Sequence, residues 1–268
     1  MSNTAERVKI TVDGNVALVT LNRPDRHNGM DFPMLEAVIK AQKTVGKMRD
    51  LRAAILIGNG PSFCAGLDFK TVLGQPAKAV LGYAKVWWPF RNDFQRWSMG
   101  WREVGVPVIA CIHGNCFGAG IQLALGADFR ITTPDARISI LEAKWGLIPD
   151  MGGAALLREL VPIDVAKELT MTGRIITGTE AKGLNLVTHV ADDPLAAARA
   201  LAAEIATRSP DSVAAGKFLY QDAYGADERG ALRAERVWQR RVIGFANFRI
   251  SVKRNQQRKE VPFARRRL

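Results

Sequence analysis

A glycine-bearing stretch in the middle of the chain decides the fold class: His113-Gly114-Asn115-Cys116-Phe117-Gly118-Ala119-Gly120. It follows an apolar run, Pro107–Ile112, that predicts a buried strand, and residues 121–126 continue with a helical pattern. Small residues let backbone N–H groups approach a ligand closely, and a helix N-terminus favours negative charge. The stretch therefore indicates a strand–loop–helix unit of an α/β protein, with a loop suited to a developing negative charge.

A second stretch has the same character: Ser62-Phe63-Cys64-Ala65-Gly66-Leu67-Asp68-Phe69-Lys70. It follows a short apolar strand predicted at Ala53–Ile57. Two backbone N–H groups aimed at one oxygen form an oxyanion hole, so the two loops are candidates for its two halves. Neither loop has the GxGxxG pattern after a first strand or the GxxxxGK[ST] pattern, which excludes a dinucleotide-binding or P-loop interpretation.

The remainder of the chain alternates strands and helices up to about residue 193 and is helical beyond it. Two strands joined by Asp13-Gly14-Asn15 fit a hairpin, and a helix follows. The further elements predicted are strands at Val8–Val12, Val16–Leu21, Phe129–Thr132 and Arg137–Ile140 and a helix at Pro33–Met48. We therefore expect an α/β core over residues 1–193 and a C-terminal helical region over residues 194–268.

The 268 residues have an ordinary globular composition, 47% hydrophobic and 24% charged, but the net charge is +12. Residues 236–268 hold 11 basic residues and one acid, which is 11 − 1 = +10, so the rest of the chain carries only +2. No RNA-binding motif accompanies these charges, and nucleic acid is an unlikely partner. We expect the charge to serve a phosphorylated ligand or a neighbouring subunit, with Arg265–Arg267 as a solvated tail.

The cysteine and histidine patterns predict free thiols and no metal site, and residues 1–10 bear on the compartment. The three cysteines, Cys64, Cys111 and Cys116, contain no CxxC pair and predict buried free thiols. The three histidines lack metal-ligand spacing. Residues 1–10 contain no apolar signal region, and the longest apolar runs are far short of a membrane span, so we expect a cytoplasmic protein.

An aromatic stripe lies between residues 83 and 101 at helical spacing. Its members are Tyr83, Trp87, Phe90, Phe94, Trp97 and Trp101, with a kink expected at Pro89. Burial statistics for aromatic residues favour a face packed into the core. The alternative is the wall or lid of a bulky apolar pocket, and both interpretations can hold for different residues.

A third stretch places two acids around an apolar segment. Glu142 and Asp150 lie within the sequence Ile140–Gly153, and apolar neighbours raise the pKa of a carboxyl toward the range that suits proton transfer. The alternatives are a surface or capping role for Glu142 and, for Asp150, the N-cap of a helix predicted over Gly152–Leu160.

Taken together, these stretches resemble the crotonase (enoyl-CoA hydratase/isomerase) superfamily over most of the chain. The residues that carry the resemblance are Leu21-Asn22-Arg23-Pro24 with Asn28, Phe63–Asp68, Pro107–Asp128, Thr172-Gly173 with Glu180–Val187, and Lys253–Phe263. The resemblance implies a spiral of ββα units with a C-terminal helical layer, assembled as trimers or hexamers. It also implies an acyl-CoA thioester substrate, with coenzyme A as part of the substrate and no separate cofactor.

The resemblance also implies site residues. The backbone N–H groups of Leu67 and Ala119 would hold the oxygen of a thioester enolate. Residues expected to bind coenzyme A are Arg23, Arg26, Ala65, Asp68 and Lys70, and those expected to line the acyl pocket are Trp87, Phe90 and Trp97.

Catalysis in hydratases of this family uses two glutamates, and here only one is present. Glu142 matches the second, whereas Gln122 stands where the first is expected and would position water or substrate. Asp150 matches an acid of the family's dienoyl-CoA isomerases. Proton shuttling needs fewer groups than water addition, so double-bond isomerisation is favoured. The alternatives are a 2-enoyl-CoA hydratase and a weakly catalytic acyl-CoA binder.

Overall fold

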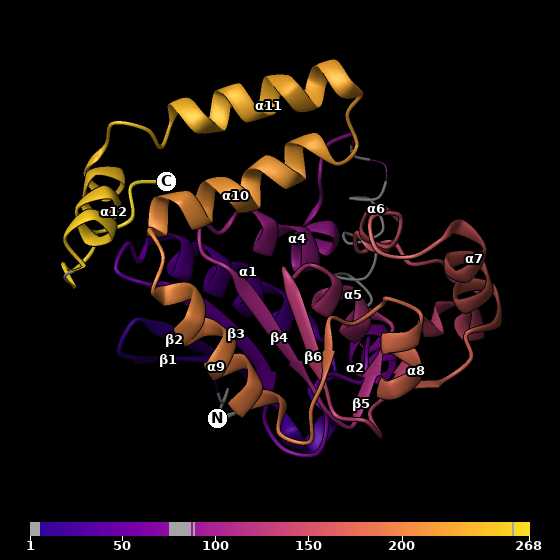
Figure 1. Cartoon of the computed structure of the whole chain (residues 1–268). Coiled ribbons are helices and arrows are strands. Elements are labelled where there is room, and N and C mark those ends of the chain that lie inside the picture. Colours follow the sequence, from indigo (N-terminus) through magenta and orange to yellow (C-terminus); the bar gives the residue numbers. More distant parts are fainter. Residues whose placement is uncertain (1–5, 75–86, 88, 259) are drawn as a thin grey trace.

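The computed structural model describes residues 6–74, 87, 89–258 and 260–268. It has two sheets surrounded by helices, with further helices at the C-terminal end (Figure 1). The strands are β1 (Val8–Asp13), β2 (Val16–Leu21), β3 (Ala53–Gly58), β4 (Val108–Ile112), β5 (Asn115–Phe117), β6 (Phe129–Thr132), β7 (Arg137–Ser139), β8 (Ile176–Thr177) and β9 (His189–Val190). This mixed α/β architecture confirms the predicted fold class.

The main sheet has the strand order β1-β2-β3-β4-β6-β9 among the described residues. β1 and β2 form the predicted antiparallel hairpin, and the other neighbours are parallel. β4 is buried along its whole length and β3 along nearly all of it, which explains why their sequences are continuous apolar runs. Both candidate loops leave the same end of this sheet, one after β3 and one after β4.

A second, smaller sheet has the order β5-β7-β8, with β5 parallel to β7 and β7 antiparallel to β8. β5 lies inside the stretch that the sequence predicted to be a loop throughout, Gly114–Gly120. An isolated parallel β-bridge between the backbones of Cys64 and Cys116 joins the first candidate loop to β5. The small sheet thus brings the two loops side by side.

Helices cover both faces of the main sheet. They are η1 (Pro24–Arg26), α1 (Phe32–Lys47), α2 (Phe69–Leu73), α4 (Asp93–Met99), η3 (Gly100–Glu103), α5 (Ala119–Leu125), η4 (Leu141–Trp145), α6 (Gly153–Leu157), α7 (Ile163–Thr172), α8 (Gly178–Gly183), α9 (Pro194–Ala206), α10 (Pro210–Ala223), α11 (Glu228–Arg240) and α12 (Ala246–Gln257). α1 packs into the larger core, whereas Ala198 and Ala202 of α9 pack against Ile55 and Ile109 on the opposite face. In Figure 1 α9 crosses this face of the sheet. The division of the chain at residues 193 and 194 stays a prediction.

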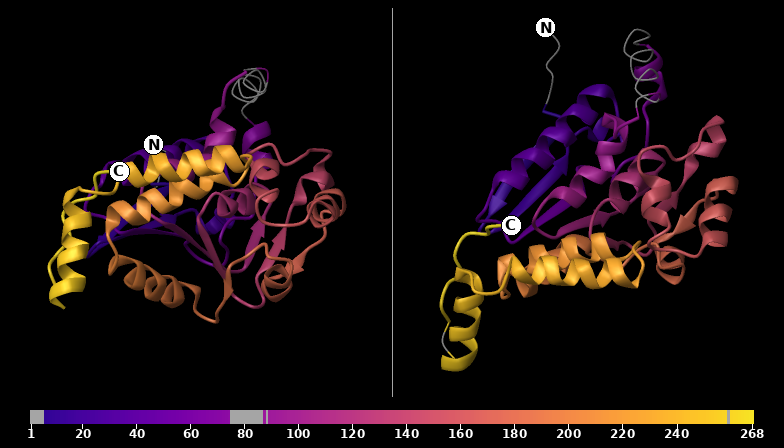
Figure 2. Two further views of the ribbon diagram at one scale, coloured as in Figure 1. Left: turned by 45° about the horizontal axis from the view of Figure 1, so that its top comes forward. Right: turned by 90° about the horizontal axis from the view of Figure 1, so that it is seen from above.

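The C-terminal helices form an outer layer. α10 and α11 lie side by side in both views of Figure 2, and the rings of Phe218 and Trp238 stack between them with centroids 5.1 Å apart. α12 lies at the edge of the molecule, beyond this pair (Figure 2). Every helix of the described part of the chain is too short or too polar to cross a membrane.

The end of the chain is docked through its backbone, so the prediction of a solvated tail is wrong for Arg266, whereas Arg265 and Arg267 are exposed. The backbone N–H of Arg266 donates to the carbonyl of Arg49 at 2.9 Å, and that of Arg267 donates to Asp211 at 2.6 Å. Arg266 is only 3% exposed. Its guanidinium contacts the carbonyls of Gly46 and Leu268. The backbone carbonyl groups of Arg49 and Gly46 and the carboxylate of Asp211 hold the tail in place. A count of the charges in the sequence does not reveal such contacts.

Candidate active site

A cavity of about 310 Å³ lies where the two candidate loops meet. Its walls come from α1, α2, α4, the start of α5, η4 and the segment after η4. The lining residues are Met30, Asp31, Phe32, Leu35, Ala65, Gly66, Leu67, Phe69, Val72, Phe94, Phe117, Gly118, Ala119, Leu141, Glu142, Trp145, Leu147, Asp150 and Met151. The cavity is largely apolar but contains three acids, and α9–α12 contribute no lining residue among those described.

Backbone hydrogen bonds fix the two loops against each other. The Cys64 N–H donates to the Asn115 carbonyl at 3.1 Å, and the Phe117 N–H donates to the Cys64 carbonyl at 3.0 Å. Gly66 has φ +97°, and a Cβ there would lie 2.8 Å from the Phe117 carbonyl oxygen. The close approach therefore requires glycine at this position.

The N–H groups of Leu67 and Ala119 belong to these adjacent loops. Ala119 is the first residue of α5, and the first N–H groups of a helix have no partner within the helix. Within residues 6–74, 87, 89–258 and 260–268, neither N–H donates to a protein acceptor. Gly118, at φ +50°, turns the chain into α5 and brings its own Cα beside Glu142, since a Cβ at Gly118 would lie 3.3 Å from Glu142 Oε1. Leu67, Ala119 and Glu142 all line the same cavity.

Glu142 is a buried acid in the first turn of η4. Its residue is 9% exposed, and Oε1 accepts a 2.6 Å hydrogen bond from Gln122 Nε2. Oε2 is buried and, in the described part of the protein, has no hydrogen-bond partner. Burial raises the pKa of Glu142, the Gln122 hydrogen bond acts against this rise, and the charge of Asp150 adds to it. This is the environment of a proton-transferring carboxyl rather than of a surface acid.

Asp150 lies at the mouth of the same cavity. The residue is exposed, yet crowding by neighbouring atoms removes enough water to raise the pKa of its carboxyl. It does not cap a helix, because α6 begins after Gly152 and has no side-chain cap. The capping alternative for Asp150 is therefore wrong, and the two acids share one cavity.

Gln122 does not face the cavity. It is 1% exposed and lies behind Glu142, on the buried first part of α5. Both ends of its amide bond the protein, and the substrate-positioning role expected for Gln122 stays a prediction.

Arg23 and Asp68, both predicted to bind coenzyme A, bond each other. Arg23 is 7% exposed, and its Nη2 lies 2.8 Å from Asp68 Oδ2 and 3.6 Å from Asp31 Oδ2. Asp68 also caps α2 through the N–H of Thr71 at 3.1 Å. The charged atoms of both side chains are engaged in these bonds, and the expected part of Arg23 and Asp68 in coenzyme A binding stays a prediction. They hold the ends of α1 and α2 beside Leu67.

The other residues predicted to bind coenzyme A are differently placed. Ala65 lines the cavity, whereas Arg26 and Lys70 are exposed outside its lining. Exposure leaves these two cations able to contact a phosphorylated group beyond the cavity.

The aromatic stripe divides between core and surface. Trp97 and Trp101 are fully buried, and the Trp97 Nε1–H donates to the Ala119 carbonyl. Trp87 and Phe90 are 78% and 70% exposed. None of the three residues Trp87, Phe90 and Trp97 belongs to the described lining of this cavity, and their assignment to an acyl pocket stays a prediction. Tyr83 lies outside the described residues, and helix α4 starts only at Asp93, after Pro89.

Five other aromatic residues line the cavity among the described residues: Phe32, Phe69, Phe94, Phe117 and Trp145. Phe94 is the member of the stripe that faces the cavity. The rings of Phe69 and Trp145 stack with centroids 4.4 Å apart and join α2 to η4 across one wall. Phe94 belongs to the same stripe as Trp97, so the helical spacing that marked the stripe is the sequence signal that could have indicated Phe94. No local pattern indicates the Phe69–Trp145 pair.

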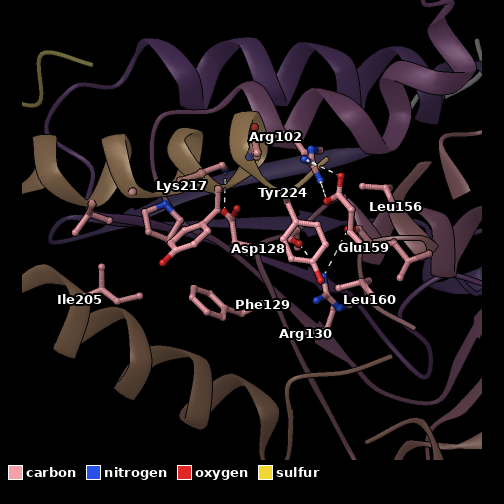
Figure 3. A pocket seen from close by; sticks show the side chains of 18 of the residues that line it. Arg102, Asp128, Phe129, Arg130, Leu156, Glu159, Leu160, Ile205, Lys217 and Tyr224 are labelled. Atoms are coloured by element: carbon pink, nitrogen blue, oxygen red, sulfur yellow. Dashed lines mark hydrogen bonds and ion pairs between the residues drawn. The ribbon is translucent and has the colours of Figure 1, made fainter. Parts of the chain in front are cut away.

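A second cavity, of about 430 Å³, lies between α6, α9, α10 and the start of β6 (Figure 3). Five of its charged side chains bond one another or the backbone: Arg102, Asp128, Arg130, Glu159 and Lys217. Arg102 pairs with Glu159 at 2.6 Å, and Lys217 pairs with Asp128 at 2.8 Å. Lys217 Nζ also donates to the carbonyls of Trp101 and Val106. These groups attach α10 to the core and leave no reactive pair comparable to the acids of the first cavity.

The part of the chain that the structure describes contains no cluster of His, Cys, Asp or Glu suited to a metal ion. Its three cysteines are free and buried, as the sequence predicted. Burial raises the pKa of Cys64 and of Cys111 to about 12. These thiols are therefore poor nucleophiles, and the chemistry of the site depends on the carboxyl groups and the backbone N–H groups.

Comparison with known proteins agrees with this geometry. The family model described as enoyl-CoA hydratase/isomerase matches residues 11–266. The chain belongs to the enoyl-CoA hydratase/isomerase family. This confirms the resemblance drawn from the sequence and makes the chain an acyl-CoA enzyme of that family.

Relatives within the enoyl-CoA hydratase/isomerase family include both reaction types. An enoyl-CoA hydratase of Mycobacterium tuberculosis is 34% identical over 188 residues, which cover 70% of this chain and 69% of that protein. The mitochondrial Delta(3,5)-Delta(2,4)-dienoyl-CoA isomerase of Rattus norvegicus is 31% identical over 83% of this chain and 72% of its own. A crystal structure of an enoyl-CoA hydratase from Bacillus anthracis matches with a TM-score of 0.88 at 26% identity, covering 96% of this chain and 98% of that one.

Proposed function

We propose that this enzyme moves the carbon–carbon double bond of an unsaturated acyl-CoA thioester, with Glu142 as its acid/base. The observation that supports this most directly is that Glu142, whose buried Oε2 has no hydrogen-bond partner among the described residues, lines the same cavity as Leu67 and Ala119, whose N–H groups donate to no acceptor in that part of the chain. A base and an oxyanion site are the two components that proton abstraction next to a carbonyl requires.

The reaction is a proton shuttle. Glu142 takes a proton from C2 of a 3-enoyl thioester, and the electron pair of the broken C–H bond moves to the thioester oxygen. The N–H groups of Leu67 and Ala119 stabilise this enolate. A proton then returns at C4 from Asp150 or from Glu142, the enolate electron pair re-forms the carbonyl, and the product is the 2-enoyl thioester. Where Asp150 supplies the proton, the proton held by Glu142 passes to Asp150 through solvent and restores both acids. No redox partner is needed.

The raised pKa values suit both roles. A carboxyl whose pKa lies above its ordinary range keeps a proton more readily, so it serves as both base and acid near neutrality. Burial supplies this effect at Glu142, and partial loss of water supplies it at Asp150.

Hydration of a 2-enoyl thioester is the second candidate. It needs a group that activates water, and the two acids of the cavity, Glu142 and Asp150, could divide that work. Isomerisation is favoured because the amide of Gln122 cannot act as a base and its polar atoms already bond the protein.

Coenzyme A would lie along Ala65 with its phosphates outside the cavity, near the exposed side chains of Arg26 and Lys70. We further propose a trimer or a hexamer. Exposed apolar residues on and beside the C-terminal helices support an assembly: Tyr220, Tyr224, Leu232, Ile243, Phe245 and Val252.

The test is a panel of 2-enoyl-, 3-enoyl- and 3,5-dienoyl-CoA, read by NMR for double-bond migration and for water addition. We expect migration without a hydroxyl product. A 3-hydroxyacyl product as the main outcome would establish the hydratase instead. Binding of these thioesters with no turnover would make the protein an acyl-CoA binder and overturn the proposal.

A further inference from the structure

The side-chain amide of Gln122 has only one possible orientation. Its Oε1 accepts hydrogen bonds from two backbone N–H groups, those of Met151 at 2.8 Å and Gly153 at 3.0 Å. An amide nitrogen cannot accept a hydrogen bond. A flipped amide would therefore place its NH₂ group opposite two backbone N–H donors. The Nε2 group must therefore face Glu142, to which it donates at 2.6 Å.

This orientation makes the two oxygens of Glu142 unequal. Oε1 faces an N–H donor, which stabilises an unprotonated oxygen. Oε2 is buried and has no hydrogen-bond partner among the described residues. A proton on this carboxyl therefore belongs on Oε2, because a proton on Oε1 would compete with the donor that already occupies that oxygen.

The same amide also holds the second acid. Met151 follows Asp150 directly, and the N–H groups of Met151 and Gly153 both end on Gln122. The carbonyl of Met151 is bonded in addition by the Ser98 hydroxyl. One buried side chain thus links the segment that carries Asp150 to the carboxyl of Glu142.

We propose that Gln122 is a positioning residue that fixes both acid-bearing segments and directs the transferred proton to Oε2 of Glu142. Gln122 is 1% exposed and lies outside the cavity lining, so it acts through Glu142 and not on the substrate. The inference rests on the proposed function for its catalytic meaning, but the hydrogen-bond arrangement can be measured without substrate.

A glutamate at this position would act differently. It would still accept from Met151 and Gly153, but its other oxygen would face Glu142 Oε1 at the distance where Gln122 Nε2 now lies. Two carboxylates this close share one proton and titrate as a coupled pair. The amide therefore keeps Glu142 from sharing its proton with a second carboxyl at position 122.

The first test is the titration of carboxyl-labelled glutamate by carbon-13 NMR on the full chain, with Glu142→Gln used to assign the Glu142 signal. In the wild type we expect a single titration step for Glu142. The Gln122 side-chain amide, followed in nitrogen-15 spectra, should shift with the same midpoint. An amide signal that does not respond to this titration would overturn the proposal in the wild type alone, with no variant needed.

The second test uses Gln122→Glu, which keeps the acceptor for both N–H groups and removes only the donor. We expect two coupled titrations, one above and one below the wild-type midpoint. At a fixed pH on the acid limb of the kcat profile, we also expect kcat to fall by about tenfold for each pH unit that this limb moves upward. KM should stay unchanged. A folded Gln122→Glu protein with the wild-type titration and pH profile would refute the role of Gln122.

Both NMR readouts are independent of turnover. If none of the enoyl thioesters reacts, the proposed function fails while the titration still decides whether Gln122 controls Glu142. If the thioesters react but the titration is unaffected, only the role of Gln122 fails.

Discussion

The indole Nε1–H of Trp97 donates a 2.7 Å hydrogen bond to the carbonyl oxygen of Ala119, the residue whose own N–H faces the proposed oxyanion position. Trp97 is fully buried, so this bond is protected from water. It fixes the start of α5 from behind, on the side away from the cavity. The aromatic residue thus supports the backbone of the site, although it does not belong to the described lining of the cavity.

Trp97→Phe should lower kcat by about tenfold with little change in KM, because loss of a hydrogen bond of about 1.4 kcal/mol loosens the Ala119 peptide. The matched control is Trp101→Phe. Trp101 is equally buried, but its Nε1–H has no partner within the described residues. We expect this control to keep its kcat. Equal losses in the two variants would show a packing effect and contradict the role of the Trp97 hydrogen bond.

Ala119→Pro removes one of the two proposed oxyanion donors. Proline is favoured at the first position of a helix, so α5 should still form. We expect kcat to fall by about 10²–10³-fold, while Ala119→Ser, which keeps the N–H, should stay near the wild-type rate. Steady-state kinetics measure kcat, and circular dichroism checks that each variant is folded. Wild-type activity in a folded Ala119→Pro protein would remove this N–H from the mechanism.

Arg23→Met leaves the carboxylates of Asp31 and Asp68 without their shared cation. Breaking a buried ion pair costs about 3–5 kcal/mol of unfolding free energy, which urea denaturation measures. Arg26→Met is the control, because Arg26 is exposed, and it should keep its stability and weaken coenzyme A binding instead. An unchanged stability of Arg23→Met with a weakened coenzyme A affinity would instead assign Arg23 to the ligand.

Lys217→Met should destabilise the fold by about 3–5 kcal/mol, since it leaves Asp128 without its ion-pair partner in the second cavity. The double variant Lys217→Met with Asp128→Asn should recover much of this loss, because no unpaired charge then remains. Thermal unfolding of the three proteins gives the answer. A single variant as stable as the wild type would show that α10 does not depend on this pair.

Backbone features of the site could be predicted from the sequence, because they depend on local residue size. The small residues around Gly66 and Gly118 indicated two loops of close backbone approach, and the structure places these loops side by side. Glu142 and Asp150 were recognised from their apolar surroundings in the chain, and they share one cavity. Strands β1, β2, β3, β4, β6 and β7 were predicted to within one residue for a similar reason, because their apolar runs are continuous or alternate, whereas β5, β8 and β9 were not predicted.

The direction of long side chains could not be predicted in the same way. Arg23 was expected to reach a phosphate, but the buried carboxylates of Asp31 and Asp68 lie closer in space than the sequence reveals. Arg266 belongs to a run of charges that resembles a solvated tail, yet carbonyl groups near the end of α1 bind it. Such partners come from distant parts of the chain, and only the fold brings them together.

The central claim is that Glu142 moves the proton at C2 of the thioester. The most direct measurement is NMR in deuterated water of a 3-enoyl-CoA incubated with the wild type and with Glu142→Gln. The wild type should exchange the C2 proton and form the 2-enoyl thioester. Glu142→Gln, which keeps shape but cannot act as a base, should slow both processes by about 10²–10⁴-fold. Exchange and migration at wild-type rates in a folded Glu142→Gln protein would contradict the account.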